Sequence, residues 1–406
     1  MRMSTSMLSQ NAVNAILDQQ SALSRTQLQL ATGKRINSPA DDPVATVQLL
    51  GLNAASSQIQ QFLSNGQTAN TRLTLQEQAL ADSTGTLQSV RDLVVQANSG
   101  TNNVADLQAI ATQIQSLGQQ LQGIANRQDA QGDYLFSGYS ASTQPFVRGA
   151  SSAMIYAGDS GTRSVPIASG TSVQLGDAGS AIYMGVPGGN GTFTTAAAAG
   201  NSGTGVIDAG SVTNPAAWVG GQYTVSFTDA SHWKVTDAAG NPVTDSSGNA
   251  VAGTYSGGSG TIAFNGVQMG ISGTPAAGDT FTVASAGSQD VFTTLDKLSS
   301  ALKSVGSSPA SRAQLASTLG GTLQQLDQAL GQVSRVSTNV GARIALISST
   351  ASSLNSQSTT VTGQISNLAD LDYAAATSQL SQQYLGLQAA ENSYAQVAQL
   401  SLFKYL

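Results

Sequence analysis

Two adjacent carboxylates, Asp41 and Asp42, are the first residues whose type and spacing suggest chemistry. They lie in the stretch TGKRINSPADDPVATVQLL (residues 32–50), directly before Pro43. Neighbouring carboxylates bind divalent cations or exchange protons in acid–base catalysis when further ligands or titratable groups converge on them. They also have a structural use, because an Asp before a helix accepts hydrogen bonds from free N–H groups of the first turn.

The residues around this pair favour the structural use. Pro43 suits the first position of a helix, because the N–H that proline lacks would have no partner there. Asp side chains at that end also face the positive pole of the helix dipole. The flanking helical segments contain no histidine and few acids, so they offer no convergent ligands. We therefore predict that Asp41, Asp42 and Pro43 form a helix cap and bind no metal.

No other group of residues has the composition of a catalytic site. The chain has no cysteine, which excludes disulfides, thiolate ligands and cysteine nucleophiles. Its one histidine, His232, precedes Trp233 in a strand-like run, where we expect a surface or edge position. The stretches GVPGGNG and SGGSGT lack the lysine and the strand–helix context of a phosphate loop. We predict no catalytic residue, no cofactor and no metal, and hence no enzyme.

Seven further aspartates stand singly in segments with turn composition, where an Asp side chain bonds its own backbone. None shows the spacing of a calcium loop, although a calcium site among them remains an alternative. They are Asp159, Asp177, Asp208, Asp229, Asp237, Asp245 and Asp279.

The chain is poor in charge. Only 9% of its 406 residues are Asp, Glu, Lys or Arg, against about 25% in an average soluble domain. The net charge of −6 is spread thinly, so nothing favours nucleic acid or an anionic membrane. Low charge weakens the repulsion between copies, so we expect self-association, with a neutral monomer covered by Ser, Thr and Gln as the alternative.

The N-terminal sequence does not have the apolar core of a cleaved secretory signal. No run approaches the roughly 18 apolar residues of a membrane span. The lack of cysteine suits a protein that must be threaded through an export channel. If this chain leaves the cell, we expect export without a cleaved signal peptide.

Composition divides the chain into three parts. Residues 1–133 are rich in Gln, Leu, Ala and Ser, residues 134–287 in Gly, Thr, Ser and Val, and the helical composition returns over residues 288–406. We predict an α+β protein in which both chain ends form a long antiparallel helical bundle or coiled-coil stem. An all-β region is inserted between them.

Apolar residues recur every seven positions in both helical parts, as in a coiled coil or a long bundle helix. The predicted stem core consists of Leu73, Leu80, Leu87, Val94, Leu326, Val333, Val340, Ile347, Leu354, Val361 and Leu368. A helix over residues 43–98 would be roughly 80 Å long. Gly66 lies in the seam of this helix and destabilises it by about 1 kcal/mol, which would allow a local kink there.

Shorter heptads mark the two ends. The C-terminal repeat changes phase over residues 369–372, where we place a break or a change of partner, and the N-terminal helix is expected to end near Gly33. The flanks of all these seams carry Gln, Ser, Thr and Ala instead of Glu and Lys, which favours cover by neighbouring protein. The predicted assembly seam consists of Ile16, Leu23, Leu30, Tyr373, Leu380, Leu387 and Tyr394.

The middle part is rich in β-strand patterns. Asn265-Gly266 separates two alternating runs, which is a strong signal for a hairpin. We expect a first β unit over residues 134–186 and a second over residues 187–287, whose first part (187–205) reads as a Gly/Ala-rich linker. The complete division is then: N-terminal arm 1–40, N-terminal stem 41–133, the two β units, C-terminal stem 288–372 and C-terminal arm 373–406.

Five motifs in this order are similar to the flagellar hook-associated protein 3 family, the hook–filament junction proteins related to flagellin. They are TGKRINSPADDPVA, GDYLFSGY (132–139), VGARI (340–344), DLDYA (370–374) and the ending LGLQAAENSYAQVAQLSLFKYL. The resemblance covers about residues 1–150 and 288–406. Flagellin itself is the near alternative, but flagellins tend to have DDAAG at the DDP position, and here YLFSG and SLFKYL depart from their pattern.

The β region is larger than usual for this family. Its segment AFNGVQMGISGTPAAGDTFTV is similar to modules of hook-associated protein 1. A rival of another class is a surface enzyme or carbohydrate-binding module on a helical stalk, with Trp218, Trp233 and Tyr223 stacking on sugars. As core residues, these three side chains need no such explanation.

The resemblance implies a structural protein of the extracellular flagellum, exported by the flagellar type III apparatus with a chaperone at the C-terminal arm. It implies a ring of identical subunits between hook-associated protein 1 and the first flagellins, with the arms inside the tube. Isolated helices like those of the arms are marginally stable. We therefore expect residues 1–40 and 373–406 to be disordered in the monomer and to fold on assembly.

Overall fold

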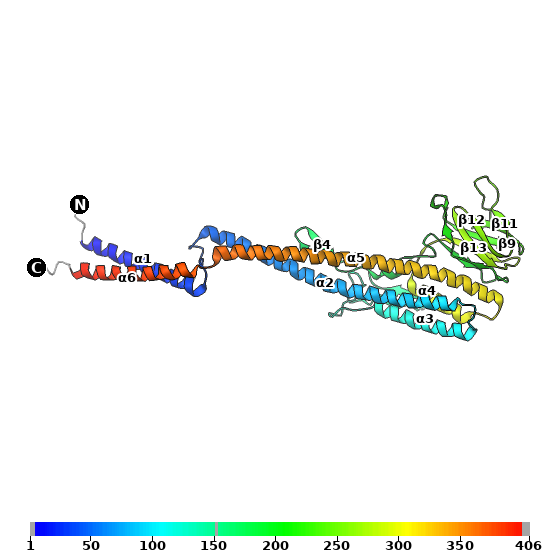
Figure 1. Cartoon of the computed structure of the whole chain (residues 1–406), viewed down its shortest axis with the longest axis horizontal. Coiled ribbons are helices and arrows are strands. Elements are labelled where there is room, and N and C mark those ends of the chain that lie inside the picture. The colour runs from blue at the N-terminus through cyan, green and yellow to red at the C-terminus, as the bar shows by residue number, and fades with distance from the viewer. Residues whose placement is uncertain (1–4, 151–152, 400–406) are drawn as a thin grey trace. The chain divides into compact units, whose positions relative to one another are not determined.

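The computed structural model describes residues 5–150 and 153–399, which fall into two compact units. Helices at both ends of the chain and a β-rich middle make the fold α+β, which confirms the predicted class (Figure 1). One unit lies within residues 1–65 and 349–406, and the other is residues 66–348. Helices α2 (Pro43–Ala97) and α5 (Pro309–Ala369) contribute to both units.

The unit that contains the chain ends is helical. Helix α1 (Thr5–Thr32) packs along α6 (Tyr373–Gln399), as Figure 1 shows. Helix α1 is followed by Gly33, whose φ of +68° is the left-handed conformation that glycine adopts at the end of a helix. The gap between α5 and α6 spans residues 370–372, where the heptad phase changes.

The other unit is built on an antiparallel pair formed by α2 and α5. Side-chain contacts join Glu77 to Ser337 and Arg91 to Asp327, so residue numbers rise along one helix as they fall along the other. Helix α3 (Val104–Ala125) begins with a capping box of Asn103 and Asp106, and α4 (Val291–Ser304) begins at Asp290, which accepts a hydrogen bond from Thr293 N–H. Helix α2 stays helical through Gly66.

One apolar core joins these helices to residues 134–186. Phe136, Phe146 and Tyr183 belong to the same buried cluster as Leu80 and Val333. The first β unit is therefore not self-contained, because its short hairpins bury their apolar residues against the helices. Its elements are β1 (Phe146–Arg148), β2 (Met154–Tyr156), β3 (Ser164–Ala168), β4 (Thr171–Gln174), the π-helix Ser180–Met184 and β5 (Val186–Pro187), which pairs with β15 (Ser288–Gln289).

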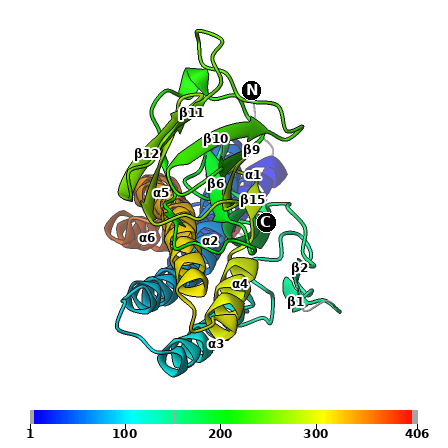
Figure 2. The same cartoon turned by 90° about the vertical axis from the view of Figure 1, so that its right-hand side faces the viewer.

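The second β unit has two antiparallel sheets over a core of its own (Figure 2). The first sheet has the order β11 (Ala252–Thr254), β10 (His232–Asp237), β9 (Gln222–Phe227), β14 (Thr280–Ser285), β6 (Phe193–Ala197). The second has the order β12 (Gly258–Phe264), β13 (Val267–Gly273), β7 (Val206–Ile207), and β8 (Ser211–Val212) also pairs with β13; a short 3-10 helix (Pro215–Ala217) follows β8.

Strand β6 corrects one expectation. Residues 187–205 read as a linker, but β6 pairs with β14 along its whole length, and Phe193 is fully buried in the core of the second β unit. Asn265 and Gly266 form the turn between β12 and β13, with φ values of +45° and +75°, as the hairpin signal predicted. Within the described residues, no helix combines the length and the apolar character that crossing a membrane requires.

Candidate functional site: the paired terminal helices and their connections

Asp42 caps helix α2, which begins at Pro43. The Asp42 Oδ1 atom accepts a hydrogen bond from the N–H of Ala45 at 3.0 Å, and the Asp42 carbonyl accepts one from Thr46 N–H at 2.9 Å. The Ala45 hydrogen bond, helped by the Arg35 guanidinium at 3.3 Å, holds the pKa of Asp42 below its usual value. The carboxylate is thus committed to the helix end and to one arginine.

Asp41 does not cap α2, and in this respect the predicted cap is wrong. Its Oδ2 atom accepts the N–H groups of Ser38 at 2.8 Å and Asn37 at 3.1 Å. These two bonds lower the pKa of Asp41. Asp41 closes the turn before the helix instead, because its side chain reaches back to the preceding N–H groups.

Two of the five motifs, far apart in the sequence, meet in this unit. Lys34 and Asp370 form an isolated antiparallel β-bridge and an ion pair of 2.7 Å. The N–H of Arg35 donates to the Ala369 carbonyl at 2.7 Å, and its guanidinium donates to the Leu368 carbonyl at 2.9 Å. The α1–α2 connection thereby caps the carboxyl end of α5. The Lys34 ammonium, with the Ser366 hydroxyl, lowers the pKa of Asp370.

The predicted assembly seam lies mostly between α1 and α6. Ile16, Leu23, Leu30, Leu380, Leu387 and Tyr394 are half-buried, whereas Tyr373 is 55% exposed. Tyr373 differs because it is the first residue of α6, and its hydroxyl lies against Gly33. The Gln19 amide donates to the Gln383 carbonyl at 3.0 Å and ties the two helices together. The residues 401–406 of the SLFKYL ending lie outside the described chain.

A second set of apolar side chains on these helices is exposed and lies out of phase with the predicted heptads. Heptad counting finds residues in phase with a seam and passes over those on the opposite face. The first turns of α2 also carry exposed apolar residues, and their spacing of three is visible in the sequence. The exposed residues are Met7, Leu17, Leu28, Tyr384 and Leu385 on α1 and α6, and Val44, Val47 and Leu50 on α2.

The predicted stem core is buried over most of its length. Leu73, Leu80, Leu87, Val94, Leu326, Val333, Val340, Ile347 and Leu354 are buried, whereas Val361 and Leu368 are half-buried. Polar residues interrupt the seam and are paired across it. The hydroxyls of Ser83 and Tyr183 are 2.7 Å apart, and Ser337 donates to Glu77 Oε1 at 2.6 Å. The buried Ser83–Tyr183 pair joins α2 to the π-helix, whereas the half-buried Ser337–Glu77 pair joins α5 to α2. A polar pair between two packed helices, such as Ser337–Glu77, favours one register.

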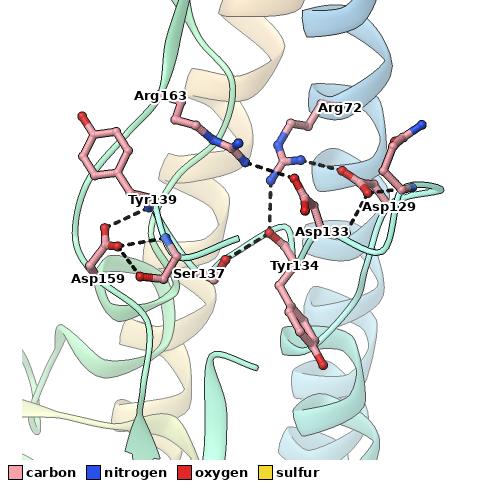
Figure 3. A network of polar contacts seen from close by, with 10 residues as sticks. Arg72, Asp129, Asp133, Tyr134, Ser137, Tyr139, Asp159 and Arg163 are labelled. Carbon is pink, nitrogen blue, oxygen red and sulfur yellow. Dashed lines mark hydrogen bonds and ion pairs between the residues drawn. The ribbon is translucent and has the colours of Figure 1, made fainter. Parts of the chain in front are cut away.

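The GDYLFSGY motif is fastened to α2 by the polar network in Figure 3. Arg72 forms an ion pair with Asp129 at 2.6 Å and donates to the carbonyl of Tyr134 at 3.1 Å. Asp159 accepts the N–H of Tyr139 at 2.9 Å. All of these contacts are internal, so the network positions a loop and presents no open site.

The described part of the chain contains no group of three or more His, Cys, Asp or Glu side chains that could hold a metal ion. His232 is 60% exposed and pairs with Asp229 at 2.9 Å. Six of the seven single aspartates accept a backbone N–H group two or three residues away, as expected of turn residues. Asp177 is the exception, because it pairs with the side chains of Arg343 and Gln76.

The aromatic residues considered for sugar stacking pack against the core of the second β unit. Tyr223 is buried, and the rings of Trp218 and Tyr223 lie 5.7 Å apart. Trp233 is half-buried against the same cluster. Their packing accounts for these residue types without a ligand.

Three family models match the chain. Residues 3–141 match the bacterial flagellin N-terminal helical region, and residues 323–406 match the bacterial flagellin C-terminal helical region. Residues 196–285 match the flagellar hook-associated protein 1, D2-like domain. This last match confirms the likeness expected for the AFNGVQMG segment.

Individual relatives agree with these matches. Flagellar hook-associated protein 3 of Escherichia coli K12 is 36% identical over 146 residues, which are 36% of this chain and 46% of that protein. The alignment therefore spans less than half the length of this curated relative. The crystal structure of Xanthomonas campestris FlgL is 32% identical with a TM-score of 0.72, and the match covers 78% of this chain and 99% of that chain. The crystal structure of flagellar hook-associated protein-3 from Legionella pneumophila is 30% identical with a TM-score of 0.74. That match covers 78% of this chain and 98% of that chain.

Proposed function

Because the chain belongs to the flagellar hook-associated protein 3 family, we propose that it is a structural subunit of the bacterial flagellum that joins the hook to the flagellin filament. Identical copies form a ring, with hook-associated protein 1 on the hook side and flagellin on the filament side. The chain is exported by the flagellar type III route without a cleaved signal, accompanied by a chaperone at the C-terminal arm. It has no enzymatic activity.

The observation that carries this proposal is the outward-facing apolar set on the terminal helices. Tyr384 and Leu385 are 63% and 67% exposed on α6, and Leu17 is 57% exposed on α1. Apolar side chains in such numbers, on helices with little charge, indicate a surface that protein covers. The only charged residues of α1 and α6 are Asp18, Arg25 and Glu391.

We propose that both arms are ordered only in the assembled ring. Ordering one residue costs about 1–2 kcal/mol of backbone entropy, which corresponds to roughly 40–80 Å² of apolar surface buried at ~25 cal/mol per Å². The α1–α6 contact leaves its seam residues only half-buried, so the pair buries too little by itself. Neighbouring copies supply the rest, which makes assembly and folding of the arms one step.

The experiment replaces Leu385 with Asp in a strain that lacks its own copy of the chain. Val219→Asp is the matched control, because Val219 is 64% exposed in the second β unit. We expect Leu385→Asp to leave hooks without filaments in electron micrographs and to release flagellin into the medium. Val219→Asp should support filaments. Normal filaments on the Leu385→Asp strain would refute the assignment of this surface.

Antibody labelling separates this role from that of flagellin, the nearest alternative. A junction subunit is labelled at one position, at the base of each filament. Labelling along the whole filament would identify the chain as the filament subunit.

A further inference from the structure

A basic groove lies between α3, α4 and the β1–β2 hairpin. Its volume is about 700 Å³, and its walls include Arg148, Asp296, Lys297 and Lys303. Arg148 and Asp296 form an ion pair of 2.9 Å, and the Lys303 ammonium donates to Gln115 at 2.8 Å. Lys297 and Lys303 are both exposed. Three cations and one anion give the groove a net positive charge.

The second β unit has the opposite charge. Residues 187–287 contain the aspartates 208, 229, 237, 245 and 279, one lysine (Lys234), and neither glutamate nor arginine. The net charge of this segment is therefore −4, with one positive and five negative groups. Asp279 is buried, but Asp208, Asp229 and Asp245 are exposed.

Two of these aspartates occupy a repeated turn. The octapeptides VTDAAGNP and VTDSSGNA follow each other over residues 235–250. Asp237 accepts the N–H groups of Ala239 at 2.9 Å and Asn241 at 2.8 Å, and Asp245 accepts those of Ser247 and Asn249 at 2.8 and 2.9 Å. These bonds lower the pKa of both carboxyls, so both turns carry a negative charge at neutral pH.

A ring of backbone hydrogen bonds fixes the two turns together. Val243 N–H donates to the Val235 carbonyl, Val251 N–H to Val243, and Val235 N–H to Val251, at 3.0, 2.7 and 3.0 Å. The tips of the turns, from Ala238 to Gly240 and from Ser246 to Gly248, are exposed. The result is a hydrogen-bonded acidic double turn (residues 237–249) on the surface of the second β unit.

The double turn and the groove belong to opposite sides of the helices in residues 66–348. The second β unit is attached to α5, where Ile207 N–H donates to the Ser317 hydroxyl at 3.2 Å. The groove belongs to α3 and α4, which lie away from the second β unit in both Figure 1 and Figure 2. Complementary surfaces on opposite sides of one subunit build head-to-tail contacts, which close into rings when the rotation allows.

We propose that the acidic double turn of one copy docks in the basic α3–α4 groove of the next copy around the ring. This contact rests on the proposed junction function and adds to it a lateral interface outside the terminal arms. Exposed ion pairs are individually weak. Complementary charge instead selects the partner and its register. The contact therefore orders neighbours in the ring, while the arms supply most of the binding energy.

The natural absence of cysteine allows a direct test by disulfide crosslinking of isolated flagella. The variant pairs Ser246→Cys on the double turn with Ser300→Cys in the groove, both at exposed positions. Oxidation should produce a ladder of covalent dimers, trimers and higher species, because each copy links to the next. The control moves the second cysteine to Ser89, an exposed residue of a different groove between α2 and α3, and should give no ladder.

Charge reversal then separates electrostatic docking from mere proximity. Lys297→Glu with Lys303→Glu should lower the crosslinked fraction by about 1.4- to 30-fold, the effect of losing one or two weak surface pairs. Adding Ala238→Lys and Ala239→Lys, at exposed turn tips, should restore it. Intact flagella that give no ladder, or a ladder unaffected by charge reversal, would overturn this inference and leave the junction role untouched. The junction role is refuted by a separate result: the natural, cysteine-free chain does not restore filaments to the strain that lacks its own copy.

Discussion

The division between a pre-formed stem and an assembly surface predicts opposite behaviour for two leucines. Leu80 of α2 is 0% exposed and belongs to the core that joins the helices to residues 134–186. Leu385 of α6 is 67% exposed. Truncating a fully buried leucine to alanine costs the transfer energy of its methyl groups and leaves a cavity, together about 2–5 kcal/mol.

Leu80→Ala should therefore reduce the free energy of unfolding by about 2–5 kcal/mol, which lowers Tm by roughly 4–15 °C for a unit of this size. Leu385→Ala removes an exposed side chain and should change the stability of the monomer by no more than about 0.5 kcal/mol. Circular dichroism at 222 nm during heating of the purified monomers measures both effects. Filament attachment by the same variants provides the second readout.

The two variants should therefore show opposite effects. Leu80→Ala should have a lower Tm and still support filaments at low temperature, whereas Leu385→Ala should have a normal Tm and impaired filament attachment. The reasoning is refuted if both variants lower Tm equally, because α6 would then belong to the stable core. It is also refuted if Leu80→Ala melts like the natural chain.

Three further predictions concern single residues and pH. Asp42→Ala should weaken the start of α2, whereas Asp42→Asn should preserve it, because Asn keeps an acceptor for Ala45 N–H. The rate of proteolysis near residue 42 measures the difference. A stoichiometric metal that is bound by the natural chain and lost from Asp42→Ala would overturn the assignment of Asp42 as a cap. The hydrogen bond from Ala45 N–H lowers the pKa of Asp42 from its ordinary value of 3.8 in the folded chain, so the stability that Asp42 contributes is present above pH 3.8 and is lost on acidification below it; melting curves that improve below this pH would contradict the assignment. Burial raises the pKa of Tyr183 from 10.0 to about 12. The free energy of unfolding should therefore fall as the pH rises from 10 to about 12, because the tyrosine ionises first in the unfolded chain. Tyr183→Phe should reduce this pH dependence, and an unchanged slope would show that another group causes it.

The helical part of the fold was predictable because heptad spacing is a long-range signal that repeats many times. The seam from Leu326 to Leu354 is buried throughout. The Asn265-Gly266 hairpin was predictable for a local reason, since two positive φ angles in succession restrict the residue types.

Features that depend on partners distant in the sequence were not predictable. Strand β6 has a small-residue composition and becomes a strand because β14 pairs with it. Asp41 is a local exception, because its partners Ser38 and Asn37 are three and four residues away and its role depends on the geometry of the turn at residues 37–41. The bridge between Lys34 and Asp370 joins two motifs that the sequence separates by most of its length.

The double turn at residues 237–249 illustrates a signal that was present but unused. An eight-residue repeat of Val, Thr, Asp, Gly and Asn is visible in the sequence. Its meaning emerges only with the three backbone hydrogen bonds that hold Val235, Val243 and Val251 together. The charge of the α3–α4 groove was hidden for a related reason, because Arg148 and Lys303 come from different parts of the chain.

Hydrogen exchange of the purified, unassembled chain tests the central claim most directly. If the apolar faces of α1 and α6 lack partners until copies assemble, their amides should exchange within seconds, while those between Leu73 and Val94 of α2 remain protected for hours. Protection of α1 and α6 equal to that of α2 in the solitary chain would contradict the account.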